Sequence, residues 1–529
     1  MSYLLSILIA IPLLAGAIVF FMPRQNPGAV RNFAVGAMLV NFVASFGLLL
    51  GGDYSVAGMQ LVQKIPLVPA YGISYEVGID GISLWLVLLT TFVTPIATFA
   101  SWTSIDTKIK EFAIAFLWLE AFMIGALVAL DLFLFYVFWE LMLVPMLLII
   151  GVWGGPQRVY AAVKFFIFTM VGSLLMLVAI LYLVAQYKAE TGNYSFSVGD
   201  LQTLLLPVST QLWLFAAFAL AFAIKVPMFP FHTWLPDAHV QAPTGGSVIL
   251  AAVLLKMGTY GFLRFAMPLF PGASHRMGAT IAAFAMVGIV YGAYCAWVQR
   301  DVKKLVAYSS VSHLGFVMLG IYSITVHGIS GAILQMVSHG ISTGALFLLV
   351  GVIYERRHTR DLDAFGGLAK VMPIYCAVFV IITMSSVGLP GTNGFVGEFM
   401  ILSGAFVSEH LGPNGPIFAT VSATGVILAA IYMLHATLKM FWGPLNNDEN
   451  KGLPDLTRRE AVGLVPLIVL VFWIGLYPAT FLNPMKPAVE SLTMQYTAKL
   501  HASDKNPDRR GVLHEIGRAS CRERVSKQV

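Results

Sequence analysis

Charged residues are scarce in this 529-residue chain, and that scarcity decides its class. Only 11% of the residues are Asp, Glu, Lys or Arg, while 58% are hydrophobic. Soluble domains carry about 25% charged residues, and the mean hydropathy of this chain is +0.81. Because a surface this poor in charge cannot stay dissolved in water, the composition predicts an integral membrane protein.

Cofactor motifs are missing as well. The three cysteines, Cys295, Cys376 and Cys521, are too far apart in sequence to form an iron–sulfur or zinc motif. The sequence also lacks a GxGxxG or P-loop motif for nucleotides. The net charge is +6, but no long basic run accompanies it, which excludes nucleic acid as a partner. Any redox chemistry associated with this chain is therefore expected on another subunit.

Long apolar runs fill the rest of the sequence. A membrane span needs about 20 mostly apolar residues, and only a helix satisfies all its backbone groups within one segment. The sequence therefore predicts an all-α polytopic membrane protein with about 14 transmembrane helices. These helices are expected near residues 3–22, 30–50, 81–101, 112–130, 132–151, 162–186, 209–230, 245–265, 278–298, 304–324, 329–352, 372–402, 417–442 and 461–482.

Lys and Arg gather in alternate loops, and this pattern predicts the orientation. Arg24, Lys108, Arg158, Lys303 and Arg356 lie in loops of the same parity. The positive-inside rule places such loops in the cytoplasm. Both termini are therefore expected on the periplasmic side of a bacterial inner membrane. The first apolar segment lacks a positive n-region, so we interpret it as a span and not as a signal peptide.

The end of the chain breaks this pattern, since it is polar and basic on the expected outer side. Residues 515–525 read EIGRASCRERV, which back-translates readily into a common sequencing-library adapter. Our hypothesis is that the sequence beyond about Leu513 is read-through from a misassembled gene. Resequencing the locus tests this, because an unbroken genomic frame through Val529 would contradict it.

Two predicted spans carry Pro and Gly at membrane depth, at 222–230 (FAIKVPMFP) and 385–398 (SSVGLPGTNGFVGE). Proline removes a backbone donor and clashes with the preceding turn, so both helices are expected to be interrupted. Each is the fourth span of a five-helix block. Paired interruptions in corresponding positions are typical of inverted-repeat transporters with a midplane site. The alternative is that Pro and Gly are simply common in membrane helices.

The expected organisation follows from these blocks. It comprises an N-terminal three-helix segment at 1–111, inverted five-helix repeats at 112–265 and 278–442, a C-terminal helix at 461–485 and a polar tail at 486–529. An odd number of helices per repeat gives the second repeat the opposite polarity in the membrane.

Four charged residues stand well inside predicted spans: Glu140, Lys225, Lys256 and Glu398. A charge at the bilayer centre costs ~2.5–3.5 kcal/mol on insertion scales, so these residues are functional candidates. Glu140 and Lys225, if close enough to interact, form a switchable proton-binding pair; a static ion pair is the alternative. Lys256 is expected to pass protons laterally, unless it snorkels to the membrane surface. Glu398 suits a proton exit group, unless it caps a half-helix.

Two histidines are further candidates for carrying protons. His313 and His339 fall inside the tenth and eleventh spans among Ser and Thr, and histidine exchanges protons through either ring nitrogen near neutral pH. Ordinary hydrogen-bonded packing is the alternative for both. The polar and aromatic segment 231–246 contains two more histidines, but their spacing does not match a metal site. We interpret that segment as a cytoplasmic loop contacting a neighbouring subunit.

The segments KVPMFPFHTWLPDAHVQAPTGGSVILAAVLLKMGTYGFLRF, DVKKLVAYSSVSHLGFVMLG and LPGTNGFVGEFMIL closely resemble the antiporter-like membrane subunits of respiratory complex I. The resemblance runs from the first span to about residue 485. It implies proton translocation through Glu140, Lys225, Lys256, His313, His339 and Glu398. A glutamate at position 398, where sister subunits usually carry lysine, resembles the subunit 4 type.

The resemblance also implies an enzyme complex, NADH:quinone oxidoreductase, in which NADH, FMN, iron–sulfur clusters and quinone bind to other chains. The partners would be neighbouring membrane subunits, including sister antiporter-like subunits, and lipid. The same family contains large subunits of sodium/proton antiporters, which keep every site residue but use an ion gradient. A purely structural scaffold is a further alternative, against which the cost of burying four charges argues.

Overall fold

The structure is a computed structural model that describes residues 3–505, and almost every described element is a helix. In its N-terminal half the helices are α1 Leu4–Phe21, α2 Pro27–Ser45, α3 Gly47–Gly51, α4 Gly81–Ala100, α5 Ile109–Val128, α6 Leu132–Leu141, α7 Leu143–Trp153, α8 Arg158–Thr191, α9 Val198–Leu201, α10 Val208–Lys225 and α11 Trp234–Gln241. In its C-terminal half they are α12 Thr244–Ile249, α13 Leu255–Gly261, α14 Met267–Leu269, α15 Pro271–Trp297, α16 Val302–Tyr322, α17 Val326–Arg357, α18 Pro373–Val387, α19 Asn393–Phe406, α20 Gly415–Phe441, α21 Arg458–Leu476 and α22 Ala479–Lys505. The suspected read-through at 515–525 lies outside the described residues.

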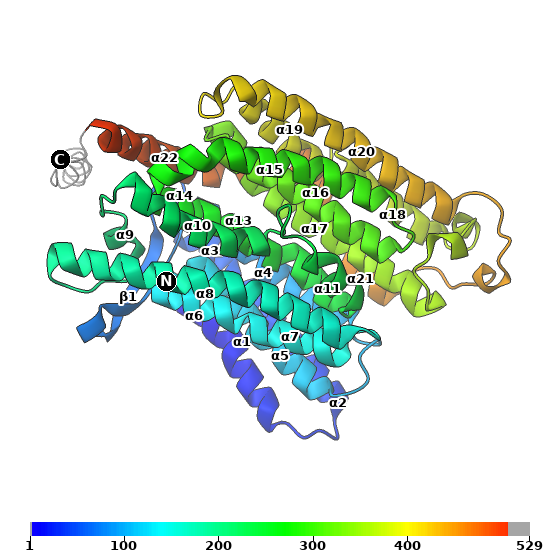
Figure 1. The fold of residues 1–529 in the computed structure, drawn as a ribbon. Coiled ribbons are helices and arrows are strands. Elements are labelled where there is room, and N and C mark those ends of the chain that lie inside the picture. The colour runs from blue at the N-terminus through cyan, green and yellow to red at the C-terminus, as the bar shows by residue number, and fades with distance from the viewer. Residues whose placement is uncertain (1–2, 506–529) are drawn as a thin grey trace.

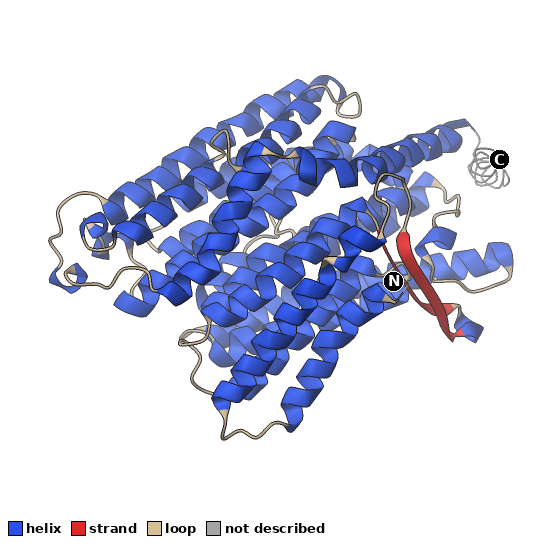
Figure 2. Ribbon diagram, turned by 180° about the vertical axis from the view of Figure 1, so that it is seen from behind, coloured by secondary structure: helices blue, strands red, loops and turns tan. Residues whose placement is uncertain are grey.

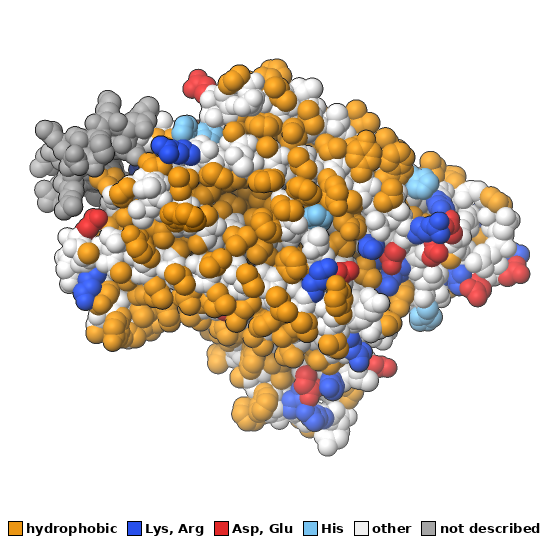
Figure 3. Space-filling view, viewed as in Figure 1, with side chains coloured by type: hydrophobic (Ala, Val, Ile, Leu, Met, Phe, Trp, Pro, Cys, Tyr) orange, Lys and Arg blue, Asp and Glu red, His pale blue; other side chains and the backbone are white. Residues whose placement is uncertain are grey.

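The predicted membrane class is confirmed. Thirteen helices within residues 3–505 are long and apolar enough to cross a membrane. Several are continuous over more than one element: α12, α13 and α14 are joined by π-helical turns at Leu250–Leu254 and Phe262–Ala266 into one span, Thr244–Leu269. The twelfth predicted span, 372–402, is not among these thirteen and is present as two short helices, α18 and α19. Apolar side chains cover the face seen in Figure 3, as expected for a surface in contact with lipid.

Both helix interruptions lie where Pro and Gly place them. α10 ends at Lys225, and α11 begins only at Trp234, after the segment that holds Pro227 and Pro230. In the second case Gly388 and Gly391 adopt φ angles of +81° and +92° between α18 and α19. Glycine adopts this left-handed region at no steric cost. The equivalence of the two five-helix blocks stays a prediction.

Two elements were not predicted. The segment 51–80, expected as a loop, contains an antiparallel hairpin of β1 Gln60–Val68 and β2 Ile73–Ile79 (Figure 2). The predicted last span, 461–482, ends at Leu476, and the predicted polar tail from 486 is instead part of α22. This helix is amphipathic, so it lacks the apolar run on which the span prediction depends. It packs against α4, α14, α15 and α17.

The helices pack in two groups that meet where α4 contacts α17, α10 contacts α15 and α11 contacts α16. The groups lie one above the other in Figure 1, with α1 to α11 below and α15 to α20 above. α4 contacts α2 and α5 on one side and α12, α17 and α22 on the other. The span Thr244–Leu269 is fully enclosed between the groups. A residue on this span can therefore contact both halves of the protein.

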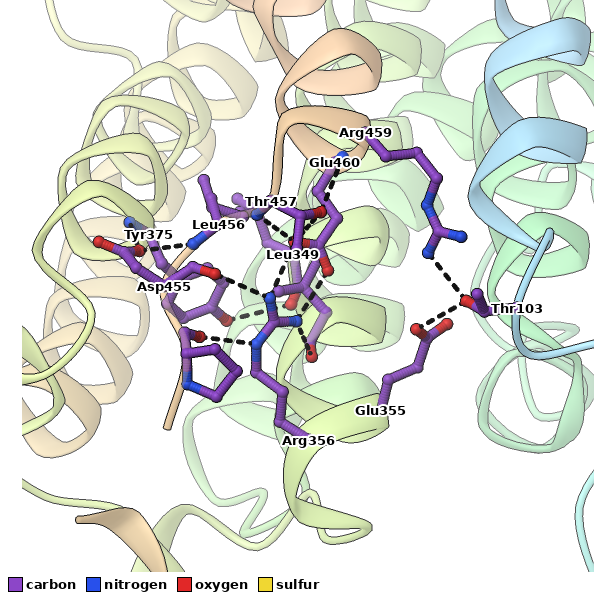
Figure 4. A network of polar contacts seen from close by, with 12 residues as sticks. Thr103, Leu349, Glu355, Arg356, Tyr375, Asp455, Leu456, Thr457, Arg459 and Glu460 are labelled. Atoms are coloured by element: carbon purple, nitrogen blue, oxygen red, sulfur yellow. Dashed lines mark hydrogen bonds and ion pairs between the residues drawn. The ribbon is translucent and has the colours of Figure 1, made fainter. Parts of the chain in front are cut away.

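A polar network fastens one end of the bundle (Figure 4). Arg356, near the end of α17, donates two hydrogen bonds of 2.7 and 2.8 Å to the carboxylate of Glu460 in α21. It also donates to the backbone oxygens of Pro454 and Asp455. Arg356, Arg357, Arg360 and Lys303 define what is called the basic end of the bundle below. The opposite end, where α16 finishes and α17 begins, is called the far end below.

Candidate functional site

A buried lysine and a buried histidine meet at the centre of the molecule. Lys256 Nζ lies 2.7 Å from His339 Nδ1 and also donates to the backbone oxygen of Ala251. Ala251 belongs to the π-helical turn before α13, and such turns are frequent at functional sites. Only 1% of Lys256 is exposed. The snorkelling alternative for Lys256 is therefore wrong, because its ammonium points into the protein.

A second buried pair continues from the first. His313 Nδ1 on α16 lies 2.9 Å from Glu398 Oε1 on α19, and the same oxygen accepts a 3.0 Å hydrogen bond from Gln335 on α17. Glu398 is five residues beyond the start of α19 at Asn393. The alternative that it caps this half-helix is therefore wrong. Its partners are side chains of two other helices.

The two pairs adjoin through their histidines. The rings of His313 and His339 are edge to face, with centroids 5.6 Å apart. Four of the six predicted site residues thus form one buried line, which is called the central line below and consists of Lys256, His339, His313 and Glu398. They come from four different helices, α13, α17, α16 and α19. Each imidazole has one hydrogen-bonding partner with an ionisable group, Lys256 for His339 and Glu398 for His313. Whether the two histidines carry protons or serve ordinary hydrogen-bonded packing stays a prediction.

Two glycines bring these helices close enough. Gly340 follows His339, and a Cβ there would lie 2.7 Å from Leu89 Cδ2 and 3.0 Å from the backbone oxygen of Ala252. Gly397 precedes Glu398, and a Cβ there would lie 2.6 Å from Gln335 Oε1. Small residues at such contacts let membrane helices approach closely. The two glycines therefore allow the helices that carry the central line to pack closely against each other.

Glu140 and Lys225 form a separate site. Lys225, the last residue of α10, is buried with its Nζ 5.1 Å from the ring centre of Trp139 and 5.7 Å from that of Phe165. Within residues 3–505 no oxygen accepts a hydrogen bond from this ammonium, and no ion pair joins it to Glu140. A desolvated cation–π contact is worth about 2 kcal/mol, which offsets part of the cost of burying the charge. Lys225 thus contacts the neighbour of Glu140 and not Glu140 itself.

The loop interpretation of 231–246 is wrong. Its centre is the buried helix α11, and His239 has no exposed surface and stacks on Phe347, with centroids 4.5 Å apart. At its surface Asp237 pairs with Lys164 at 2.7 Å. Within the described part of the chain, no group of three or more His, Cys, Asp or Glu side chains is placed to hold a metal ion.

Sequence reasoning missed three buried polar groups. Glu120 on α5 accepts a 2.8 Å hydrogen bond from Asn41 on α2. Arg264 pairs with Asp80 at 2.5 Å, across the contact between the Thr244–Leu269 span and the start of α4. Gln335 binds Glu398, as described above. Glu120 could have been found from the sequence, because it is an acidic residue inside a predicted span. The other two contacts depend on which helices pack together, and the sequence does not show this.

The chain matches a known protein family. The family model for NADH:quinone oxidoreductase/Mrp antiporter transmembrane proteins matches residues 129–435, which hold the central line, Glu140 and Lys225. The chain belongs to this family.

Relatives in the family resemble this chain over almost its whole length. The Rhodobacter capsulatus protein named NADH-quinone oxidoreductase subunit M is 47% identical over 511 residues, covering 94% of this chain and 98% of that protein. The structure of respiratory complex I from Thermus thermophilus contains a chain with a TM-score of 0.84 and 32% identity, covering 94% of this chain and all of that one. A chain of the Mrp complex from Dietzia has a TM-score of 0.79 at 21% identity, which shows a shared fold.

Proposed function

We propose that this chain is the proton-translocating membrane subunit of an NADH:quinone oxidoreductase, of the type named subunit M or chain 4. The observation that carries this proposal is 47% identity to a subunit M across 94% of the chain. The chain would then act as one part of a translocating enzyme. Its partners would be the other membrane subunits of that complex, including sister antiporter-like subunits.

The central line supplies a route for protons. The Lys256 ammonium can donate to His339 Nδ1, since the two nitrogens are 2.7 Å apart. Imidazole accepts a proton on one ring nitrogen and releases one from the other, and the next ring, His313, is in edge contact. His313 then exchanges its proton with Glu398, whose carboxylate is held by Gln335. The first and last of these steps follow direct hydrogen bonds, whereas the step between the two rings, which share no hydrogen bond among the described residues, would need a bridging water.

Lys225 and Glu140 would supply the central line. α10 and α13 are in direct contact, and the Cβ that Gly258 lacks would lie 2.6 Å from the backbone oxygen of Phe222. The helix that ends at Lys225 thus lies against the helix that carries Lys256. We expect Glu140 and Lys225 to approach each other in one state of the cycle and to separate in another, because a nearby carboxylate favours the charged form of a lysine and its absence favours release of the proton.

The same proposal sets how the chain is organised and oriented in the membrane and where the cofactors of the complex bind. The blocks 112–265 and 278–442 would be inverted repeats, one around each interrupted helix. The basic end would face the cytoplasm of a bacterium and both termini the periplasm. NADH, FMN, iron–sulfur clusters and quinone would bind to other subunits, since the sequence of this chain has no motif for them.

Isolation of the chain with its neighbours tests the proposal. Native membranes are extracted gently, this chain is captured by a tag, and the isolate is assayed for flavin, iron and NADH:quinone activity. Co-purification of all three is the expected result. If the neighbours are membrane proteins without flavin or iron, the chain instead serves a sodium/proton antiporter and the redox part of the proposal is wrong.

A further inference from the structure

Three buried hydroxyl groups face one another at the far end. Ser274 at the start of α15 lies beside both Tyr322, at the end of α16, and Tyr496 on α22. None of the three side chains is more than 2% exposed. Ser274 lies near hydrogen-bonding distance of both tyrosine hydroxyls, yet none of the three groups has a well-formed hydrogen bond among the described side chains. Buried polar atoms are nearly always partnered, so this group is built for an additional ligand with hydrogen-bonding capacity.

Two histidines extend the group to the surface. His410, in the segment after α19, lies with its Nδ1 3.0 Å from Nδ1 of His275. Its ring also faces Tyr496, with centroids 6.3 Å apart, and its Nε2 is buried without a partner among the described residues. His410 is half-buried and His275 is exposed. The five side chains together, called the far-end cluster below, thus run from the interior to the surface.

The far-end cluster lies at the ends of the two helices that carry the last pair of the central line. His313 precedes Tyr322 by nine residues on α16, a rise of about 14 Å. Glu398 is on α19, which ends at Phe406, four residues before His410. Ser408 donates a 2.6 Å hydrogen bond to the backbone oxygen of Ser323, which fastens the segment after α19 to the end of α16. The far-end cluster thus lies on the same two helices as His313 and Glu398, nearer the surface opposite the basic end.

We propose that the far-end cluster is the site through which protons taken from the central line are released at the surface opposite the basic end. The hydroxyl groups of Ser274, Tyr322 and Tyr496 would hold the water that carries the proton, and the pair His410–His275 would pass it to solvent. This inference rests on the proposed function of the chain.

The electrostatics of His410 suit release. Burial and the neighbouring His275 together lower the pKa of His410 to about 4. A group with so low a pKa is neutral at ordinary pH and holds a proton only in transit. Lys499 on α22 is the nearest basic group of that helix, and its Nζ donates to the backbone oxygen of Pro268. Burial lowers its pKa to about 8, so it is still mostly charged at neutral pH and disfavours a second positive charge near it.

The test uses the assembled complex reconstituted in liposomes, with the rate of proton translocation measured during NADH oxidation. We expect the double variant His275→Ala/His410→Ala to translocate at least tenfold more slowly, because a positioned proton carrier contributes ~10²–10⁴-fold. Added imidazole should restore much of the rate, since His275 is exposed. Tyr496→Phe should slow translocation without rescue. Tyr294→Phe, an exposed tyrosine on α15, is the matched control and should be unchanged.

A wild-type rate in the assembled double variant would overturn the inference. So would a slow rate that imidazole leaves unchanged, because that result indicates a structural role for the histidines. Lys256→Ala is measured in parallel. If Lys256→Ala is inactive while the double variant is normal, only the release site is wrong; if Lys256→Ala is also normal, the proposed function falls with it.

Discussion

Removal of His339 should separate the two halves of the central line. His339 is the group between Lys256, 2.7 Å away, and the ring of His313, whose centre is 5.6 Å away. The substitution His339→Ala leaves no titratable side chain between them. A positioned acid–base group is worth ~10²–10⁴-fold in a proton transfer, so translocation should fall at least ~100-fold. His339→Gln fills the space without exchanging protons and should be similarly slow.

The assay follows proton uptake into vesicles driven by NADH, normalised to the amount of assembled complex on a native gel. Loss of the hydrogen bond from Lys256 costs about 1.5–3 kcal/mol, which is small against the packing of a fully buried helix, so assembly should persist. His327→Ala is the matched control, because His327 is exposed on the same helix. Assembled His339→Ala complex that translocates within twofold of wild type would refute this reasoning.

Three other substitutions separate function from stability. Glu398→Gln keeps its size and can still bond to neighbours but cannot exchange a proton, so translocation should be lost in assembled complex; normal vesicle acidification would remove Glu398 from the central line. Glu120→Gln should pump normally, because this side chain faces Asn41 and lies outside that line, and a pumping defect would show that the line is incomplete. Arg264→Leu should destabilise the chain by about 3–5 kcal/mol, because it leaves the carboxylate of Asp80 buried and unpaired. In thermal unfolding, Asp80→Asn added to it should restore part of that loss, and an additive further loss would contradict the pairing.

The sequence predicted the elements that depend on local composition. Apolar runs located the spans, and the Pro and Gly residues around Pro227 and Gly388 located both interruptions, because each acts on its own backbone. Charges such as Lys256 and Glu398 were noticeable for the same reason, since a charge inside an apolar run is rare.

What the sequence could not provide was the three-dimensional arrangement of the side chains. The bond from Lys256 to His339 joins residues 83 positions apart. The ammonium of Lys225 is close enough to Glu140 for their charges to interact, but it lies over the ring of Trp139 and makes no direct ion pair with Glu140 among the described residues. α22 was missed because its amphipathic composition resembles that of a solvated segment. Such outcomes depend on which helix faces pack together, and no local pattern specifies them.

The measurement that tests the central claim most directly compares Lys256→Arg with Lys256→Ala. Arginine keeps a positive charge at this position but is not deprotonated in proteins. If Lys256 works by giving up its proton to His339, the assembled Lys256→Arg complex should fail to translocate protons, as Lys256→Ala does. If Lys256→Arg translocates protons at the wild-type rate, a fixed charge suffices at this position, and the central line is not the path of the proton.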